Sequence, residues 1–443
     1  MKGQKLLIAA ISIMIMVTSC KKDDPPIDPT IPNTITATLA TLPSDPIPAG
    51  YTLIVTDAIT ISTDLSALRA VLNESEGNIK LVLPQATGII SEAFSGCTSI
   101  SKVDLPMVVT LEYEAFIDCK SLTDISLPKV TTIGNDAFAG CISLATVNFP
   151  MATSIGYYAF GVCSSLTTVD LPEITILSDE IFYDCPLLKT VNAPKVANIG
   201  ENAFHACISL TTISFPAATN IGNSVFYGCK TLTTINLPKV ESVGAAAFAS
   251  CIALNSISLP MATNLDISAF YGCTSLKTVD FPKVEIVGKD AFRLCSSLAT
   301  ISLPMATSLD TYAFTGCISL ATVSLPKVNS VGPSAFSSCI SLNSISLPMA
   351  TSIGANAFIE CISLKTVSLP AATSIGGYSF LECPSLNSLT IGGTTKMTTV
   401  GGNLFNAPAA QIDLTLGSGE AGEANTATKM WRSYGPFKSI TIL

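Results

Sequence analysis

Residues 144–165 read LATVNFPMATSIGYYAFGVCSS, and this stretch of 22 residues contains the pattern that decides the fold. At its start, Val147 and Phe149 alternate with Thr146 and Asn148, which is typical of a short strand with one buried face. Pro150 follows and has no backbone N–H to donate, so we expect the strand to end there and the chain to turn. The stretch therefore predicts a very short strand whose inward side chains need a partner surface.

The same pattern recurs fourteen times without an insertion. Phenylalanine and cysteine both recur in steps of 22 residues, and proline does the same from Pro84 to Pro370. The phenylalanines are Phe94, Phe116, Phe138, Phe160, Phe182, Phe204, Phe226, Phe248, Phe270, Phe292, Phe314, Phe336, Phe358 and Phe380, each followed three residues later by a cysteine. So short a unit cannot bury its own apolar face, and neighbouring copies must stack. The period predicts a solenoid over residues 84–391.

The second half of the unit predicts the other side of each coil. Ile155-Gly156 is interpreted as a second short strand with a bend where glycine is useful. The run from Tyr158 to Cys163 is interpreted as one helical turn, with Ala159 facing inward and Phe160 at the centre of the coil. We expect a mostly β solenoid with a parallel sheet on one face and short helical turns and short strands on the other, capped at both ends.

Two motifs, L-x-x-I/V-x-L-P and I-G-x-x-A-F-x-x-C-x-S-L, cover residues 84–391 and resemble the BspA-like class of leucine-rich repeats. The resemblance implies a right-handed leucine-rich-repeat solenoid of the kind found in surface proteins of oral and gut bacteria. The usual unit of that class has about 23 residues and this one has 22, which should change curvature rather than fold. Glu112, Ser178, Asp266 and Asp310 replace the usual glycine.

A longer period lies within the array. After the proline, Met-Ala at Met261 and Met305 alternates with Lys-Val at Lys239, Lys283 and Lys327. The alternation indicates that the array grew by duplication of a 44-residue pair of coils. We interpret it as a trace of duplication without a function of its own.

The first 32 residues predict export and anchoring. Lys2 and Lys5 precede an apolar run at residues 6–17 that is too short to span a bilayer, so residues 1–19 are interpreted as a lipoprotein signal peptide. The sequence Val-Thr-Ser-Cys ending at Cys20 resembles a lipobox, which implies lipidation of Cys20; an ordinary signal peptide with an incidental cysteine is the alternative. Residues 20–32 would form a lipid anchor and Pro-rich tether.

The acidic residues after Cys20 resemble the surface-export signal of Bacteroides-type lipoproteins. The resemblance implies an outer-membrane lipoprotein exposed at the cell surface, with a periplasm-facing protein as the alternative. Contact with the membrane would then be through the lipid anchor only.

Residues 33–83 and 392–443 lack the repeat and are interpreted as caps, which a solenoid needs at its apolar ends. In the first we expect a helix from residue 63 to residue 72 with Asp64 as its N-cap, then a strand at residues 79–83. In the second we expect a strand at residues 412–416, a helix at residues 423–431 and a final strand.

Composition excludes some classes of function. Charged residues make up 12% of the chain, about half the usual share, and the formal net charge is −9. No basic stripe is present, so a nucleic-acid partner is not expected.

The residues with chemical potential are interpreted as structural. The repeat cysteines are expected to form a ladder of buried free thiols, with occasional disulfides as the alternative. His205, the only histidine, is expected at the surface beside Tyr183, Asp184 and Tyr227, and the tyrosines of this region look scattered. No Walker-type loop, G-x-S-x-G or H-E-x-x-H motif occurs. The sequence predicts no enzyme and no catalytic, cofactor-binding or metal-ligating residue.

The outward face of the repeated strands is the candidate binding face, although Thr and Ser also simply suit exposed strands. Its candidate residues are Thr168, Asp170, Thr190, Asn192, Thr212, Ser214, Thr234, Asn236, Thr278 and Asp280. The first hypothesis is a surface protein that binds a protein ligand in adhesion to host, matrix or other bacterial cells. A glycan-binding lipoprotein and a passive structural component of the envelope are the alternatives.

Overall fold

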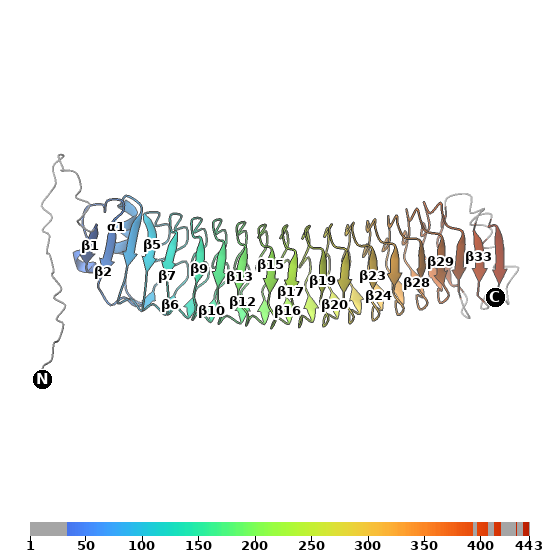
Figure 1. The fold of residues 1–443 in the computed structure, drawn as a ribbon, viewed down its shortest axis with the longest axis horizontal. Helices are drawn as coiled ribbons and strands as arrows, with labels where there is room; N and C mark the ends of the chain where they lie inside the picture. The colour runs from blue at the N-terminus through green and yellow to red at the C-terminus, as the bar shows by residue number, and fades with distance from the viewer. Residues whose placement is uncertain (1–32, 393–396, 406–411, 418–430, 432–436, 443) are drawn as a thin grey trace, which may run out of the picture.

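The computed structural model describes residues 33–392, 397–405, 412–417, 431 and 437–442. Successive coils lie side by side in a long rod, with β1 near one end and β33 near the other (Figure 1). Each coil of the array contributes one front strand and one shorter back strand, joined by turns. The prediction of a leucine-rich-repeat solenoid is confirmed.

The front strands form one face of the rod, and all of their pairs are parallel. Within the array each residue pairs with the residue 22 positions further on, as Thr168 does with Thr190. The front strands are β1 Thr34–Ala37, β2 Thr52–Val55, β3 Ile79–Val82, β5 Ile100–Asp104, β7 Asp124–Ser126, β9 Thr146–Asn148, β11 Thr168–Asp170, β13 Thr190–Asn192, β15 Thr212–Ser214, β17 Thr234–Asn236, β19 Ser256–Ser258, β21 Thr278–Asp280, β23 Thr300–Ser302, β25 Thr322–Ser324, β27 Ser344–Ser346, β29 Thr366–Leu369, β31 Ser388–Ile391, β33 Asp413–Leu416 and β34 Ser439–Ile442.

The back strands are two residues long and also pair in parallel. They are β4 Gly88–Ile89, β6 Thr110–Leu111, β8 Thr132–Ile133, β10 Ser154–Ile155, β12 Ile176–Leu177, β14 Asn198–Ile199, β16 Asn220–Ile221, β18 Ser242–Val243, β20 Asn264–Leu265, β22 Ile286–Val287, β24 Ser308–Leu309, β26 Ser330–Val331, β28 Ser352–Ile353, β30 Ser374–Ile375 and β32 Thr399–Val400. From β12 to β32 they form one unbroken sheet of eleven strands.

A column of phenylalanine rings runs through the core. From Phe94 to Phe405 the ring centroids of successive coils lie 5.1 to 5.7 Å apart. Phe160 and Phe182 stack at 5.6 Å and both are fully buried. This geometry confirms the prediction that equivalent side chains of successive coils form columns.

The segment from Tyr158 to Cys163 contains hydrogen-bonded turns and does not form a helix. Tyr158 and Val162 have φ angles of 52° and 58°, in the left-handed region, and equivalent residues repeat this in every coil. These angles interrupt helical geometry but aim alternate N–H groups at the next coil, where Phe160 N–H donates to the carbonyl of Ile181 at 3.0 Å. The prediction of one helical turn is therefore corrected to a turn that hydrogen-bonds along the rod.

The repeat cysteines form a thiol ladder beside the phenylalanine column. All fourteen are free, and all but Cys383 are buried. From Cys119 to Cys383, each thiol donates a hydrogen bond to the carbonyl of the phenylalanine 25 residues earlier, at 3.0 to 3.3 Å. Burial raises the pKa of these thiols, to about 12 at Cys163. The ladder is therefore made of neutral, satisfied thiols.

The front sheet is interrupted at five places, whereas the back strands pair across every one of them. Its hydrogen-bonded groups are β1 to β7, β9 to β13, β15 with β17, β19 with β21, β23 with β25, and β27 to β34. We call the five gaps between these groups the front junctions. The central residue just before four of them (Val191, Ile235, Val279 and Val323) is only partly buried. Ile213 and Ile257, just after a junction, are 2% and 4% exposed.

The front junctions follow the 44-residue alternation of the sequence. Each one comes after a Lys-Val coil and before a Met-Ala or Ala-Ala coil. Within a closed pair the lysine reaches back to the methionine of the preceding coil, as Lys283 Nζ does to Met261 Sδ at 3.3 Å and Lys327 to Met305 at 3.2 Å. The two-coil period is therefore a unit of structure as well as a trace of duplication.

Both ends continue the front sheet. At the first, β1 to β3 pair in sequence and β3 continues to β5. Helix α1, Ser66–Glu74, buries Leu68 and Leu72, and a short 3-10 turn, η1, covers Leu39–Thr41. Asp64 is not the N-cap as predicted, because the helix begins two residues later with Leu65 in that position; the Asp64 carboxylate instead accepts the Ser66 N–H at 2.9 Å.

At the other end, β33 and β34 form parallel pairs that extend the sheet, so the predicted strand at residues 412–416 is present. The helix predicted at residues 423–431 lies outside the described residues except for Trp431, which is fully buried and meets Phe437 edge to face at 6.4 Å.

Candidate binding face

The two outward rows of the front strands lie at the surface, as the alternation predicts. The first row contains Thr168, Thr190, Thr212, Thr234 and Thr278, and all five are exposed. In the second row Asn192, Ser214, Asn236 and Asp280 are exposed and Asp170 is half-buried. Equivalent side chains of successive coils line up along the rod, so the face presents rows of hydroxyl, amide and carboxylate groups.

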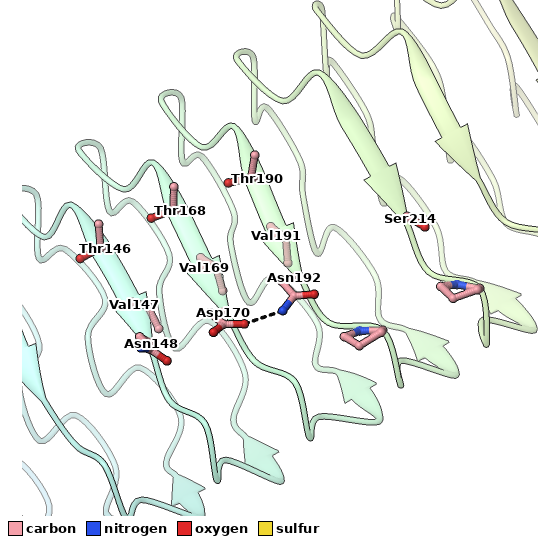
Figure 2. A pocket seen from close by; sticks show the side chains of 12 residues that line it. Thr146, Val147, Asn148, Thr168, Val169, Asp170, Thr190, Val191, Asn192 and Ser214 are labelled. Carbon is pink, nitrogen blue, oxygen red and sulfur yellow. Dashed lines mark hydrogen bonds between the residues drawn. The ribbon is translucent and has the colours of Figure 1, made fainter.

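One part of this face is hollowed. An open hollow of about 530 Å³ is lined by every residue of β9, β11 and β13, together with Pro194, Ser214 and Pro216 (Figure 2). Five of the ten candidate residues, at positions 168, 170, 190, 192 and 214, therefore meet in one place. The structure places the other five, at positions 212, 234, 236, 278 and 280, further along the face and outside the hollow.

The hollow lies over the array's only described group of three hydrogen-bonded strands between two front junctions. Because β9, β11 and β13 are in register, Asn148, Asp170 and Asn192 lie side by side across them. Asn192 Nδ2 donates to Asp170 Oδ1 at 2.6 Å, the hydrogen bond drawn in Figure 2. The carboxylate is thus flanked by an amide on each side.

Neighbouring groups of strands carry simpler contacts. Asn236 Nδ2 donates to the Ser214 hydroxyl at 2.9 Å, and the Ser258 hydroxyl donates to Asp280 Oδ2 at 2.8 Å. Each contact joins the two strands of a closed pair and none crosses a front junction. The junctions therefore divide the face into short polar segments.

Three of the tyrosines that look scattered in the sequence lie in one column with His205. Tyr158 and Tyr183 lie 6.0 Å apart, Tyr183 and His205 stack at 4.7 Å, and His205 and Tyr227 stack at 4.9 Å with parallel rings. We call these four rings the aromatic column; it lies on the turns of the coils that carry the hollow. Burial lowers the pKa of His205 from its usual value.

The 22-residue spacing of the repeat does not reveal this column. Tyr158 occupies a different repeat position from the other three rings, and it joins them because the same coil has Gly161 in their position. A Cβ added at Gly161 would lie 2.4 Å from the Tyr158 ring, so a side chain there would displace it. The signal in the sequence was therefore a tyrosine two residues before a repeat phenylalanine combined with a glycine just after it.

The described residues do not include a group of three or more His, Cys, Asp or Glu side chains that could hold a metal ion. Within the same residues, no helix has both the length and the apolar character needed to cross a membrane. What the face offers chemically is an array of hydrogen-bond donors and acceptors around an apolar floor, which suits binding.

Comparisons with known proteins agree with the geometry. The sequence model of the family described as BspA type Leucine rich repeat region (6 copies) matches residues 87–211, 197–320 and 285–411. A leucine-rich repeat protein from Bacteroides ovatus is 23% identical with a TM-score of 0.52, over 68% of this chain and 91% of its own. A leucine-rich cell surface protein from Faecalibacterium prausnitzii is 24% identical with a TM-score of 0.38, over 72% of this chain and 89% of its own. No curated protein matches the sequence.

Proposed function

Because the chain belongs to the BspA-type leucine-rich repeat family, we propose that it is a cell-surface lipoprotein whose front face binds protein partners. Solenoids of this kind typically serve as binding scaffolds, because stacked coils present a long surface that a single coil could not hold. The observation that carries the proposal is the hollow over β9, β11 and β13. Adhesion to host, matrix or other bacterial cells is the role that such a surface on an exported protein would serve.

The chemistry of the hollow favours a protein ligand. Its apolar surface comes from the partly buried Val191 and from Pro194 and Pro216, and polar side chains surround them. Val147 and Val169, at its base, are 2% and 3% exposed. An apolar centre with a polar rim is the usual anatomy of a protein–protein interface. None of the lining residues is aromatic, whereas sugars are commonly held on exposed ring faces. In the aromatic column, His205 has a tyrosine ring stacked on each of its faces, whereas Tyr227 is 40% exposed but lies outside the hollow.

Anchoring rests on the sequence before the described residues. Lipidation of Cys20 would attach more than one acyl chain, which makes membrane attachment stable. The Pro-rich segment that follows would hold the solenoid away from the membrane. Replacing this cysteine (Cys20→Ser) should release the protein from membranes, and labelling with a radioactive fatty acid should fail. A chain that remains membrane-bound and labelled would contradict the anchor.

The binding role is tested with the full chain, purified in detergent, on a panel of matrix proteins and on a glycan array. The double variant Thr168→Lys with Asn192→Lys fills and charges the hollow. The matched control, Thr300→Lys with Ser324→Lys, makes the same changes at the same two registers of β23 and β25. Loss of protein binding in the first variant alone supports the proposal. Binding to glycans alone, or protein binding that both variants retain, would refute it.

A further inference from the structure

We propose that the hollow is a receptor for an arginine side chain of the protein partner, with Asp170 as its anchoring carboxylate. The inference rests on the proposed function, because it identifies a chemical group that the bound protein would supply. It follows from three features of the hollow: a carboxylate that no described cation neutralises, acceptors on both sides of it, and an apolar floor leading to it.

The first feature is the state of the Asp170 carboxylate. It is half-buried, and no lysine or arginine among the described residues forms an ion pair with it. The lysine of the adjoining coil, Lys195, is already bound to Glu173. The hydrogen bond from Asn192 occupies only Oδ1. A half-buried charge satisfied on one oxygen is a site where an incoming cation gains more than at the open surface.

The second feature is the row of acceptors around the carboxylate. Asn192 uses its amide N–H to hold Asp170, so its side-chain oxygen stays available as an acceptor. Asn148 lies in register on the other side and brings a second amide. A guanidinium has five N–H donors in a rigid fork, whereas an ammonium is a compact charge with three. A row with several acceptors therefore fits arginine better than lysine.

The third feature is the floor. Val191, which is only partly buried, and the exposed prolines at positions 194 and 216 form an apolar surface beside the carboxylate. The strand that carries Val191, β13, borders a front junction. The methylene stem of an arginine could cover this surface while its head reaches Asp170. Stem and head would thus be recognised together.

The rest of the front face shows why the site is singular. Asp280 occupies the same register on β21, yet it accepts the Ser258 hydroxyl and has a hydrogen-bonded strand on one side only. Asp104, on β5, lies 3.9 Å from Lys80. Of these three aspartates, Asp170 is the one that both stands in the middle of three joined strands and lines the hollow described here. Asp280 is therefore a natural control.

The test uses the full chain in detergent, labelled with ¹⁵N at asparagine side chains, and titrates it with a capped Gly-Arg-Gly peptide amide. Capped Gly-Lys-Gly and free arginine serve as further probes. The expected result is a saturable shift of the Asn192 amide signal, at least tenfold weaker binding of the lysine peptide, and loss of the shift in Asp170→Asn. Asp280→Asn should bind as the parent chain does.

A second pair of variants keeps the test informative if Asp170→Asn disturbs the strands. Ser214→Trp places a ring at the rim of the hollow, and Ser302→Trp places the same ring at the same register of β23. Binding should fall at least tenfold in the first and stay unchanged in the second. No shift with the arginine peptide, equal binding of both peptides, or stronger binding of free arginine would overturn the inference. Partner capture that survives Asp170→Asn would overturn it alone and leave the proposed function standing.

Discussion

The front junctions make a prediction about which backbone amides are protected from solvent. Just after each front strand, one N–H points along the rod. Where the next front strand is hydrogen-bonded to its own, this N–H donates to a backbone carbonyl of that strand. Leu259 N–H donates to the carbonyl of Asp280 at 3.0 Å and Leu303 N–H to that of Ser324 at 3.1 Å. At the equivalent position before a junction, Leu237 and Leu325 donate no hydrogen bond to another described residue. Transfer of the folded chain into deuterated water should separate the two sets.

The size of the difference follows from what each amide must break in order to exchange. Freeing the Leu259 N–H means parting β19 from β21, which exposes Ile257, now 4% exposed, and breaks ladder hydrogen bonds. Burial of such a side chain is worth about 2 kcal/mol and each hydrogen bond about 1 kcal/mol. An opening cost of about 3 to 4 kcal/mol slows exchange by two to three powers of ten, at about 1.4 kcal/mol per factor of ten.

The assay is hydrogen–deuterium exchange read by mass spectrometry with fragmentation to single residues. The amides of Leu237 and Leu325 should exchange at least tenfold faster than those of Leu259 and Leu303, because they break no ladder bond. Phe248 N–H, which donates to Ala269 at 2.8 Å in the same region, is an internal standard for a protected amide. Equal protection of both sets would refute the two-coil unit.

Three further outcomes are expected. Phe248→Ala removes a ring whose centroid lies 5.3 and 5.2 Å from those of its two neighbours. It should lower the free energy of unfolding, measured by urea denaturation, by about 3 to 5 kcal/mol. A loss below about 1 kcal/mol would contradict the packed column. Burial raises the pKa of Cys163 from 9.0 to about 12, so the neutral thiol stabilises the fold below pH 9 and this stability is lost as the pH rises towards 12. Circular dichroism together with a thiol reagent should therefore show alkaline unfolding. An unchanged fold with no thiol reaction at pH 12 would count against the ladder. Gly156→Ala places a Cβ 2.4 Å from the backbone nitrogen of Asn135 in the preceding coil. It should lower the melting temperature more than Gly228→Ala, because Gly228 has open space around it and its φ of 70° costs a side chain only about 1 kcal/mol. The reverse order would be inconsistent with close contact between coils.

The repeat made the fold predictable because one period of 22 residues fixes the neighbours of every core side chain. Phe160 has to meet Phe182 in any stacked arrangement, and the outward rows follow from the alternation around Val147. The same reasoning failed where geometry depends on a local angle. The turn after Gly156 looked helical, and only the positive φ of Tyr158 shows that its N–H groups turn towards the next coil.

The sequence predicted which face of the solenoid carries the candidate residues, but not where along that face the hollow lies. The rows containing Thr168 and Asp170 could be read from the sequence, but their grouping depends on where the front ladder opens. The Met-Lys alternation marked the period without revealing that it separates β13 from β15.

The five front junctions also set how the molecule would fail under load. A surface protein held at one end and bound at the other is under tension along its length, and the coil interfaces then bear the force in series. Those with an open front have fewer hydrogen bonds to share it, so rupture would begin there. Most of the array between β9 and β25 would separate into two-coil segments, each with its phenyl rings still paired. The molecule would then lengthen under force in small steps before any single coil unfolds.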